Sequence, residues 1–281
     1  MVKSRENLVS GEINKEESSN ESVIHWADTA AVSVMKRKRE TYVVAAGVAP
    51  SGSVTFGHLR EVISAEIVAR AIINRGGKVK LIYSWDDYDV FRKVPKNMPN
   101  KEELKNHLRK AVIDIPDPFG KSSNYAAGFE QGLEAVLPRL GIMPNYRYQA
   151  KQYRDCKYSE GIKKALSQRK EVIEILNEHR EKPLSSDYWP ITIYSDIDGT
   201  DLTKVLSWDG DKMITYLDVD NKRKTIDLTL SGAVKLLWRI DWPMRWAYEG
   251  VDFEPAGKDH HTAGGSFDTA EPISRIVYNN E

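Results

Sequence analysis

The segment from Pro50 to His58 carries the residue types that bind phosphate groups. It is rich in Gly, Pro and Ser, and it joins a short β-prone run, 42–46, to a helical pattern that starts at His58. Free N–H groups and the positive dipole end of a helix favour anions, and Gly52 and Gly57 let the backbone approach a ligand closely. The alternative is an ordinary Gly/Pro turn with a surface histidine. Because the segment is neither a Walker A nor a G-x-G-x-x-G sequence, those two classes of nucleotide-binding protein are disfavoured.

Two other groups of residues are candidates for chemistry. Asp86, Asp87 and Asp89 directly follow a second β-prone run, where they either bind a metal or cap and turn the chain. Aromatic side chains are concentrated at 236–246, and a histidine pair follows at 260–261. Three tryptophans within nine residues either pack a core or form the wall of a pocket, and the histidines alone are typical of core or surface positions.

The hydrophobic pattern around these residues predicts an α/β fold. A strand at 42–46, a helix from 58 to the glycines at 76–77 and a strand at 78–85 form a βαβ unit, which builds a parallel sheet. The first loop therefore lies at the carboxyl edge of the sheet, where such folds bind ligands. Further helices are predicted at 23–38, 124–140 and 158–180, and short β runs between 191 and 230 predict a small antiparallel subdomain.

Composition excludes several classes of protein. Lys and Arg number 41 and Asp and Glu number 41, so the net charge is zero, which disfavours binding of nucleic acid by bulk charge but leaves room for a local basic patch. With Cys156 as the one cysteine, neither an internal disulfide nor a multi-cysteine metal site can form. No apolar run reaches the roughly 20 residues that span a bilayer, and the amino terminus lacks the apolar core of a signal peptide, so we expect a cytoplasmic protein without membrane partners.

Several longer motifs resemble class I lysyl-tRNA synthetase. The loop P-S-G-x-x-T-x-G-H-L-R-E is similar to the HIGH signature of class I aminoacyl-tRNA synthetases. The blocks that narrow the resemblance to the lysyl family are His25–Asp28, Trp85–Pro95, Ile115–Pro118, Trp238–Trp246 and Gly250–His260. The similarity extends from about residue 25 to 281. It implies a doubly wound nucleotide-binding sheet of Rossmann type that contains an inserted helical and small antiparallel β subdomain.

The resemblance also implies ligands and residue roles. Family members use ATP and Mg²⁺ to convert lysine to lysyl-adenylate and then transfer the lysyl group to tRNA. Thr55 stands where the first histidine of the signature usually is, and His58 stands where this family often has asparagine. The resemblance assigns phosphate binding and catalysis to Thr55, His58 and Lys258, and the ATP site to Pro50, Ser51, Gly52, Gly57, His58, Gly257 and Asp259. It assigns the amino-acid pocket to Gly47, Ala49, Trp238 and His260, with Ala49 where relatives commonly have threonine.

The residues themselves agree with these roles in outline. Adenylate formation needs positioned donors for the phosphates more than a protein nucleophile. A lysine ammonium needs a carboxylate and an aromatic wall, for which Asp241, Glu254 and the three tryptophans are candidates.

Two features of the family pattern are missing from this sequence. Many relatives carry Cys and His zinc ligands in the inserted β subdomain, whereas 194–228 contains neither residue, so we expect no zinc. The K-M-S-K-S signature and the helical anticodon-binding domain are also absent. We therefore expect a disordered tail at 1–22, a first half of the nucleotide-binding domain at 23–90, an insertion at 91–235 with its β subdomain at about 191–230, and an incomplete second half at 236–281.

These absences leave three functional interpretations open. The chain is a catalytic-domain portion of a lysine–tRNA ligase, with impaired or incomplete activity. Alternatively, it is a shortened, non-catalytic paralogue that binds ATP or an amino acid. A third interpretation is a small-molecule ligase that never meets tRNA, and binding to tRNA would be weakened without the anticodon-binding domain in any case.

Overall fold

The computed structural model of the protein describes residues 25–52 and 55–280, so the tail predicted at 1–22 lies outside the described residues. Its α-helices are α1 (Trp26–Met35), α2 (Phe56–Asn74), α3 (Lys101–Lys105), α4 (Tyr125–Glu134), α5 (Gln149–Arg154), α6 (Ser159–Ser167), α7 (Arg169–Asn177), α8 (Trp238–Glu249) and α9 (Ser266–Tyr278). Its strands are β1 (Tyr42–Val48), β2 (Val79–Trp85), β3 (Asn145–Tyr148), β4 (Ile191–Ile193), β5 (Lys204–Trp208), β6 (Met213–Leu217), β7 (Arg223–Asp227) and β8 (Val234–Leu236). The 3₁₀ turns are η1 (Val112–Asp114), η2 (Leu137–Leu140) and η3 (Lys258–His261).

A parallel sheet with the order β1-β2-β3 positions the first loop. Val44 and Ala46 of β1 and Tyr83 of β2 are buried on one face, together with the apolar side of α2, because side chains alternate between the two faces of a strand. Helix α2 ends where Gly76 adopts a positive φ of 84°, which a residue without a Cβ accepts without strain. The predicted βαβ unit is therefore present, and its helix begins at Phe56.

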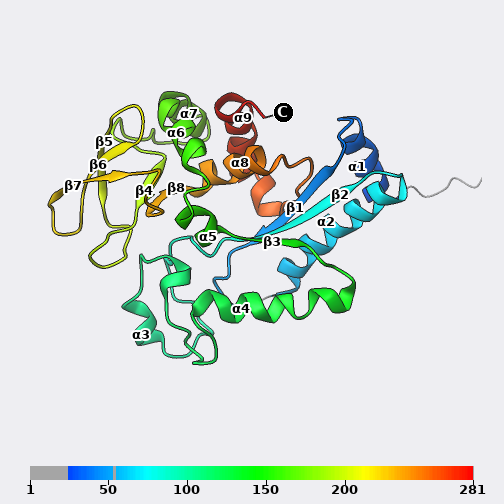
Figure 1. The fold of residues 1–281 in the computed structure, drawn as a ribbon, viewed down its shortest axis with the longest axis horizontal. Coiled ribbons are helices and arrows are strands. Elements are labelled where there is room, and N and C mark those ends of the chain that lie inside the picture. The colour runs from blue at the N-terminus through cyan, green and yellow to red at the C-terminus, as the bar shows by residue number, and fades with distance from the viewer. Residues whose placement is uncertain (1–24, 53–54, 281) are drawn as a thin grey trace, which may run out of the picture.

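Helix α8 covers the other face of this sheet. Its residue Glu249 accepts hydrogen bonds from Lys80 at 3.0 Å and from Arg147 at 2.6 Å, and Arg245 donates to the Ser84 hydroxyl at 2.9 Å. Figure 1 shows α2 and α8 on opposite sides of the strands. Helices on both faces of a parallel sheet give the doubly wound arrangement that the sequence predicted.

Two segments outside the predicted βαβ unit lie along the sheet. Strand β3 pairs with β2 in parallel, although its residues lie within the range 91–235 that was assigned to the insertion. The strand-like run 251–253 makes a single parallel bridge, between Phe253 and Val44. The Asp252 carboxylate holds this run against β1 by accepting from the Val43 N–H at 3.0 Å.

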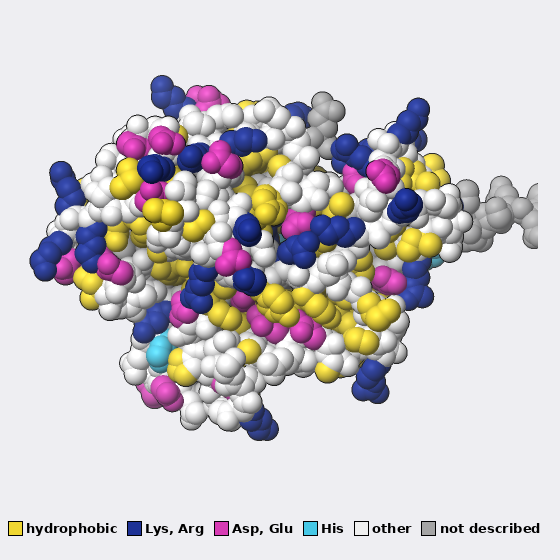
Figure 2. Space-filling model, in the orientation of Figure 1, with side chains coloured by type: hydrophobic (Ala, Val, Ile, Leu, Met, Phe, Trp, Pro, Cys, Tyr) yellow, Lys and Arg dark blue, Asp and Glu magenta, His cyan; other side chains and the backbone are white. Residues whose placement is uncertain are grey.

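The antiparallel strands form two small sheets, β4-β8 and β5-β6-β7. A large apolar cluster joins β4, β6 and β8 to helices α6 to α9, so these strands share a core with the carboxyl-terminal helices. Figure 1 shows the three-stranded sheet at one end of the molecule and α1 at the other. Across the face in Figure 2, acidic and basic side chains are interspersed, as expected from the zero net charge.

Among the helices of the described residues, none combines the length and the apolar character that a membrane span requires.

Candidate functional site

A cavity of about 830 Å³ opens at the carboxyl ends of β1 and β2, where the loop after each strand leaves the sheet. Gly47 and Ala49 line it from β1 and the loop that follows. A Cβ at position 47 would lie 2.9 Å from the Ser84 carbonyl oxygen, so only glycine permits the close pairing of the two strands here. Trp238 and His260 line the opposite side. All four residues assigned to the amino-acid pocket therefore face one cavity.

The phosphate-binding assignments divide into two sets. Ser51 and His58 line the cavity. The others do not belong to its lining: Pro50 is buried, Gly52 is half-buried, and Thr55 and Gly57 are exposed. The Tyr125 hydroxyl donates to the Ser51 carbonyl oxygen at 2.8 Å and so ties the loop to α4.

His58 is held as a neutral donor. The Thr55 N–H donates to His58 Nδ1 at 3.2 Å, so this nitrogen is an acceptor and the proton of a neutral ring lies on Nε2. Burial lowers the pKa of His58, which favours this neutral form. Position 58 lies in the first turn of α2, beside the free N–H groups of the helix start. The neutral ring can donate a hydrogen bond from Nε2 to an anionic phosphate oxygen.

The other three residues assigned to the ATP site or to catalysis, Gly257, Lys258 and Asp259, are not part of the cavity lining. Lys258 and Asp259 are exposed at the start of η3. Gly257 faces α2, because a Cβ there would lie 3.3 Å from Glu61 Oε1.

Glu61 is a site residue that the sequence reasoning missed. It lies one turn after His58 on α2 and lines the cavity. Within the part of the chain that the structure describes, its carboxylate has no hydrogen bond or ion pair. Burial raises its pKa, partly opposed by Arg60. The i, i+3 spacing from His58 was the signal that could have identified it.

A separate acidic and aromatic recess adjoins the cavity and shares part of its lining, including Glu61 and Trp238. It is lined by Gly47, Glu61, Asp86, Trp238, Trp242, Arg245, Glu254, Pro255, Ala256 and His260. The rings of Trp238 and Trp242 stack with centroids 5.4 Å apart, and the His260 ring lies 5.3 Å from Trp242. Burial lowers the pKa of His260, so a neutral imidazole adds no positive charge here. The recess is suited to an organic cation, which aromatic faces and carboxylates attract.

Glu254 is the second carboxylate of this recess. It accepts a hydrogen bond from Trp246 Nε1 at 2.6 Å. Burial raises its pKa, Arg245 and the tryptophan N–H groups lower it, and the nearby Glu61 raises it further. Two carboxylates that disfavour each other's ionisation would both be relieved by a bound ammonium.

Asp241 was the other carboxylate proposed to bind an ammonium, and the structure does not support that role. It is buried and accepts from the Tyr153 hydroxyl and, at 3.0 Å, from Lys235 Nζ. Burial opposes its ionisation, but Lys235 and Arg245 outweigh burial and hold its pKa below the usual range. Asp241 is thus neutralised by the chain itself.

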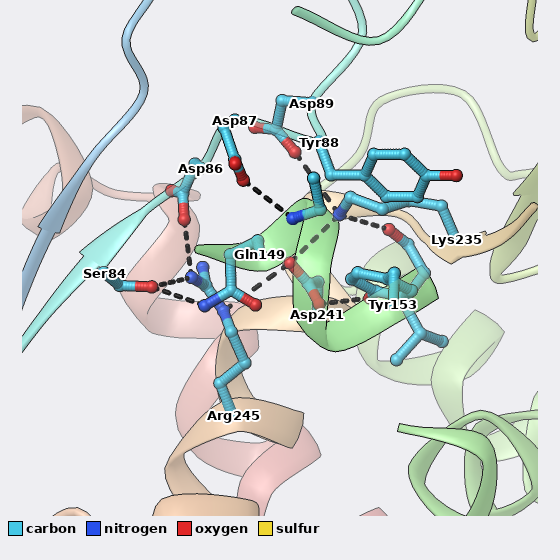
Figure 3. Close-up of polar contacts among 12 residues, drawn as sticks. Ser84, Asp86, Asp87, Tyr88, Asp89, Gln149, Tyr153, Lys235, Asp241 and Arg245 are labelled. Atoms are coloured by element: carbon cyan, nitrogen blue, oxygen red, sulfur yellow. Dashed lines mark hydrogen bonds and ion pairs between the residues drawn. The ribbon is translucent and has the colours of Figure 1, made fainter. Parts of the chain in front are cut away.

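The three aspartates after β2 also have internal partners (Figure 3). Asp86 accepts from Arg245 at 2.5 Å, Asp89 pairs with Lys235 at 3.3 Å, and Asp87 accepts from the Ala150 N–H at the start of α5 at 2.7 Å. They are bridging and capping residues. Across residues 25–52 and 55–280, no group of three or more His, Cys, Asp or Glu side chains is arranged to hold a metal ion.

The comparison with known families decides the assignment of the chain. Residues 24–281 match the family described as tRNA synthetases class I (K). The chain belongs to this family. The resemblance noted from the motifs is thereby confirmed, and the doubly wound fold is the one expected of class I (K) synthetases.

Individual relatives agree. The chain is 47% identical over 254 residues to a lysine–tRNA ligase of Borrelia garinii subsp. bavariensis, which covers 90% of this chain and 49% of the relative. It is 40% identical over 265 residues to a lysine–tRNA ligase of Pyrococcus horikoshii, covering 92% of this chain and 50% of the relative. A solved structure titled as a putative arginyl-tRNA synthetase from Campylobacter jejuni matches with a TM-score of 0.35 at 14% identity, over 91% of this chain and 58% of that one, and adds nothing to the assignment. The chain spans about half the length of the curated relatives it matches.

Proposed function

We propose that this chain performs the amino-acid activation chemistry of a lysine–tRNA ligase. In this reaction a carboxylate oxygen of lysine attacks the α-phosphorus of ATP. The bond from that phosphorus to the bridging oxygen breaks, and pyrophosphate leaves with the electron pair. The observation that supports the proposal is the acidic and aromatic recess, with Glu254 and Trp242, beside the cavity that contains Ser51 and His58 of the phosphate-binding loop. Glu61 and Trp238 line both.

In this proposal the recess binds the lysine side chain, and the phosphate-binding loop with the start of α2 binds ATP. The lysine side chain enters the recess, so that its ammonium meets Glu61 and its methylene groups contact Trp238. Gly47 and Ala49 lie beside the reacting end of the amino acid. The start of α2, with His58 Nε2, donates to the phosphates. All of the residue roles assigned from the resemblance stay predictions, including those outside the cavity lining: Pro50, Gly52, Thr55, Gly57, Gly257, Lys258 and Asp259.

ATP enters this scheme with Mg²⁺ as a complex, since the metal neutralises charge on the phosphates. Transfer of the lysyl group to the 3′ end of tRNA is the second step that the relatives' name implies. The expected cytoplasmic location also stays a prediction.

Lysine-dependent exchange of pyrophosphate into ATP tests the proposal, because it reports adenylate formation without requiring tRNA. We expect the 281-residue polypeptide to exchange measurably with lysine, but at least ~100-fold more slowly than a full-length relative, because transition-state charge stabilisation by the K-M-S-K-S lysines is missing. Arginine and ornithine are the controls for side-chain recognition. Exchange that is absent with lysine while ATP still binds would favour the non-catalytic paralogue, and exchange with another amino acid would contradict the lysine assignment.

A further inference from the structure

The loop between β2 and α3 brings three cations to the lining of the cavity. Arg92, Lys93 and Lys96 line the same cavity as Ser51 and His58, and all three are exposed. None of them lines the acidic and aromatic recess. We call these three side chains the cationic rim. They come from a different segment than the phosphate-binding loop and were not among the residues expected to bind a ligand.

The backbone that carries the cationic rim is firmly held. Phe91 and Met98 are buried on either side of it. The Phe91 N–H donates to the Lys110 carbonyl at 2.8 Å, and the Arg109 N–H donates to the Phe91 carbonyl at 2.9 Å. The rim therefore places long, flexible side chains on a fixed base.

The rim also lies beside the phosphate-binding loop. A Cβ at Gly52 would lie 3.9 Å from Cγ of Pro95, so the two loops are in contact at this point. Within the described residues, Arg92, Lys93 and Lys96 make no ion pair with a carboxylate. Asp86 and Asp89 also line the cavity, but they are paired with Arg245 and Lys235. Asp201, on whose pKa the charge of Arg92 acts, forms its ion pair with Arg109. The rim side chains are therefore available to a ligand.

The cavity and the adjoining recess consequently have opposite preferences. The recess, with Glu61 and Glu254, favours a cation, and the cavity lining that contains the rim and the start of α2 favours an anion. We propose that Arg92, Lys93 and Lys96 bind the β- and γ-phosphates of ATP beside the phosphate-binding loop. This inference rests on the proposed function, whose two substrates carry an ammonium and a polyphosphate.

The test compares nucleotides that differ in phosphate number. In the variant R92Q/K93Q/K96Q we expect ATP affinity to fall by about 10-fold or more and AMP affinity to change by less than about 3-fold, because AMP lacks the β- and γ-phosphates. The difference should shrink at high ionic strength, because salt screens exposed charges. The matched control is K164Q/K170Q/K182Q, which removes three exposed lysines that neither line the cavity nor form ion pairs among the described residues. Calorimetry on the full chain measures the ATP and AMP affinities of the unaltered protein and of both variants.

A measurement on the unaltered chain guards against misfolding of the variant. Inorganic tripolyphosphate should compete with ATP for the unaltered protein, and this competition should be lost in the rim variant while the thermal unfolding temperature is retained. An equal loss of ATP and AMP affinity would overturn the proposal, because it would indicate a structural effect. Unchanged ATP affinity together with weakened binding of a tRNA 3′-end oligonucleotide would also overturn it, since the rim would then contact RNA.

Failure of the proposed function would look different. One outcome is that lysine-dependent exchange is absent while the rim variant still shows reduced ATP affinity and unchanged AMP affinity. In that case the rim binds polyphosphate in a protein that does not activate lysine. If exchange is present and the rim variant exchanges like the unaltered chain at limiting ATP, the rim assignment is wrong and the activation chemistry stands.

Discussion

Replacement of Glu61 by glutamine tests the cation-binding recess most directly. The substitution keeps the size of the side chain and removes its charge. Glu61 lines both the cavity and its recess and has no ion-pair partner among the described residues. Its charge is therefore available to a ligand.

The magnitude follows from the kind of bond that is lost. A hydrogen bond between charged groups contributes roughly 1.5–3 kcal/mol. At roughly 1.4 kcal/mol for each factor of ten, Glu61→Gln should weaken lysine binding by about 10- to 150-fold. ATP affinity should change little, because Glu61 lies in the recess and not at the cationic rim. Calorimetric titration with lysine and the lysine KM in pyrophosphate exchange both measure the effect.

Glu61→Gln should weaken lysine binding without lowering the stability of the fold. Burial raises the pKa of Glu61, so the folded chain binds this proton more tightly than the unfolded chain does. Its contribution to the free energy of unfolding is therefore lost as pH rises through the raised pKa, and the charged form destabilises the fold at neutral pH. Glu61→Gln should then leave the unfolding temperature unchanged or slightly higher. Lysine binding by the unaltered protein should weaken on acidification, and this part of the pH dependence should disappear in the variant.

Glu66 provides the control on the same helix. Its carboxylate pairs with Arg70 at 2.7 Å and is not part of the cavity lining, so Glu66→Gln makes the same charge change away from the site. Lysine affinity that is equal in Glu61→Gln and the unaltered protein would refute the assignment of the recess. An equal loss in Glu61→Gln and Glu66→Gln would show that net charge, and not the recess, determines binding.

Three further predictions concern the phosphate loop, the buried ion network and the inserted strands. His58→Ala should weaken ATP binding by roughly 1–2 kcal/mol, because a hydrogen bond to an anionic phosphate oxygen is lost, and equal ATP affinity in calorimetry would remove His58 from the site. Lys235→Ala should lower the free energy of unfolding in urea by about 3–5 kcal/mol, because buried Asp241 loses the ammonium of Lys235. Lys204→Ala, at an exposed ion pair, should lower it by under about 1 kcal/mol. Elemental analysis of the purified, untagged chain should find no tightly bound zinc, since 194–228 has no Cys or His, and about one zinc per chain would contradict this expectation.

The sequence predicted the βαβ unit well because its signals are local. Strand 78–85 and the helix after His58 show apolar periodicities that belong to one element each, and the structure has β2 at Val79–Trp85. Strand β3 was missed, because its four residues, Asn145 to Tyr148, are polar or half-buried and show no clear alternation. Its place in the sheet depends on pairing with β2, which is a tertiary contact that periodicity does not report.

Candidate binding residues were predictable where a motif marked them. Gly47, Ala49, Ser51, His58, Trp238 and His260 were all expected, and all line the cavity. Lys258 was expected to face the phosphates, but the turn at η3 leaves it exposed and outside the cavity lining. The cationic rim does line the cavity, and it belongs to a loop whose direction is set by the burial of Phe91 and Met98. No local sequence pattern indicates that direction.

The carboxylates of the molecule show why charge type alone could not identify the recess. Asp241 looked suitable because it lies among three tryptophans, yet Lys235 and Arg245 already surround it. Glu61 looked like one more polar residue of a helix, yet it lines the cavity and has no ion-pair partner among the residues that the structure describes. A buried carboxylate that has internal cations is already satisfied, and a substrate ammonium would have to displace them at the cost of leaving those cations unpaired. The carboxylate that can bind a substrate cation is therefore the one that the fold leaves without a partner, and this distinction exists only after the chain has folded.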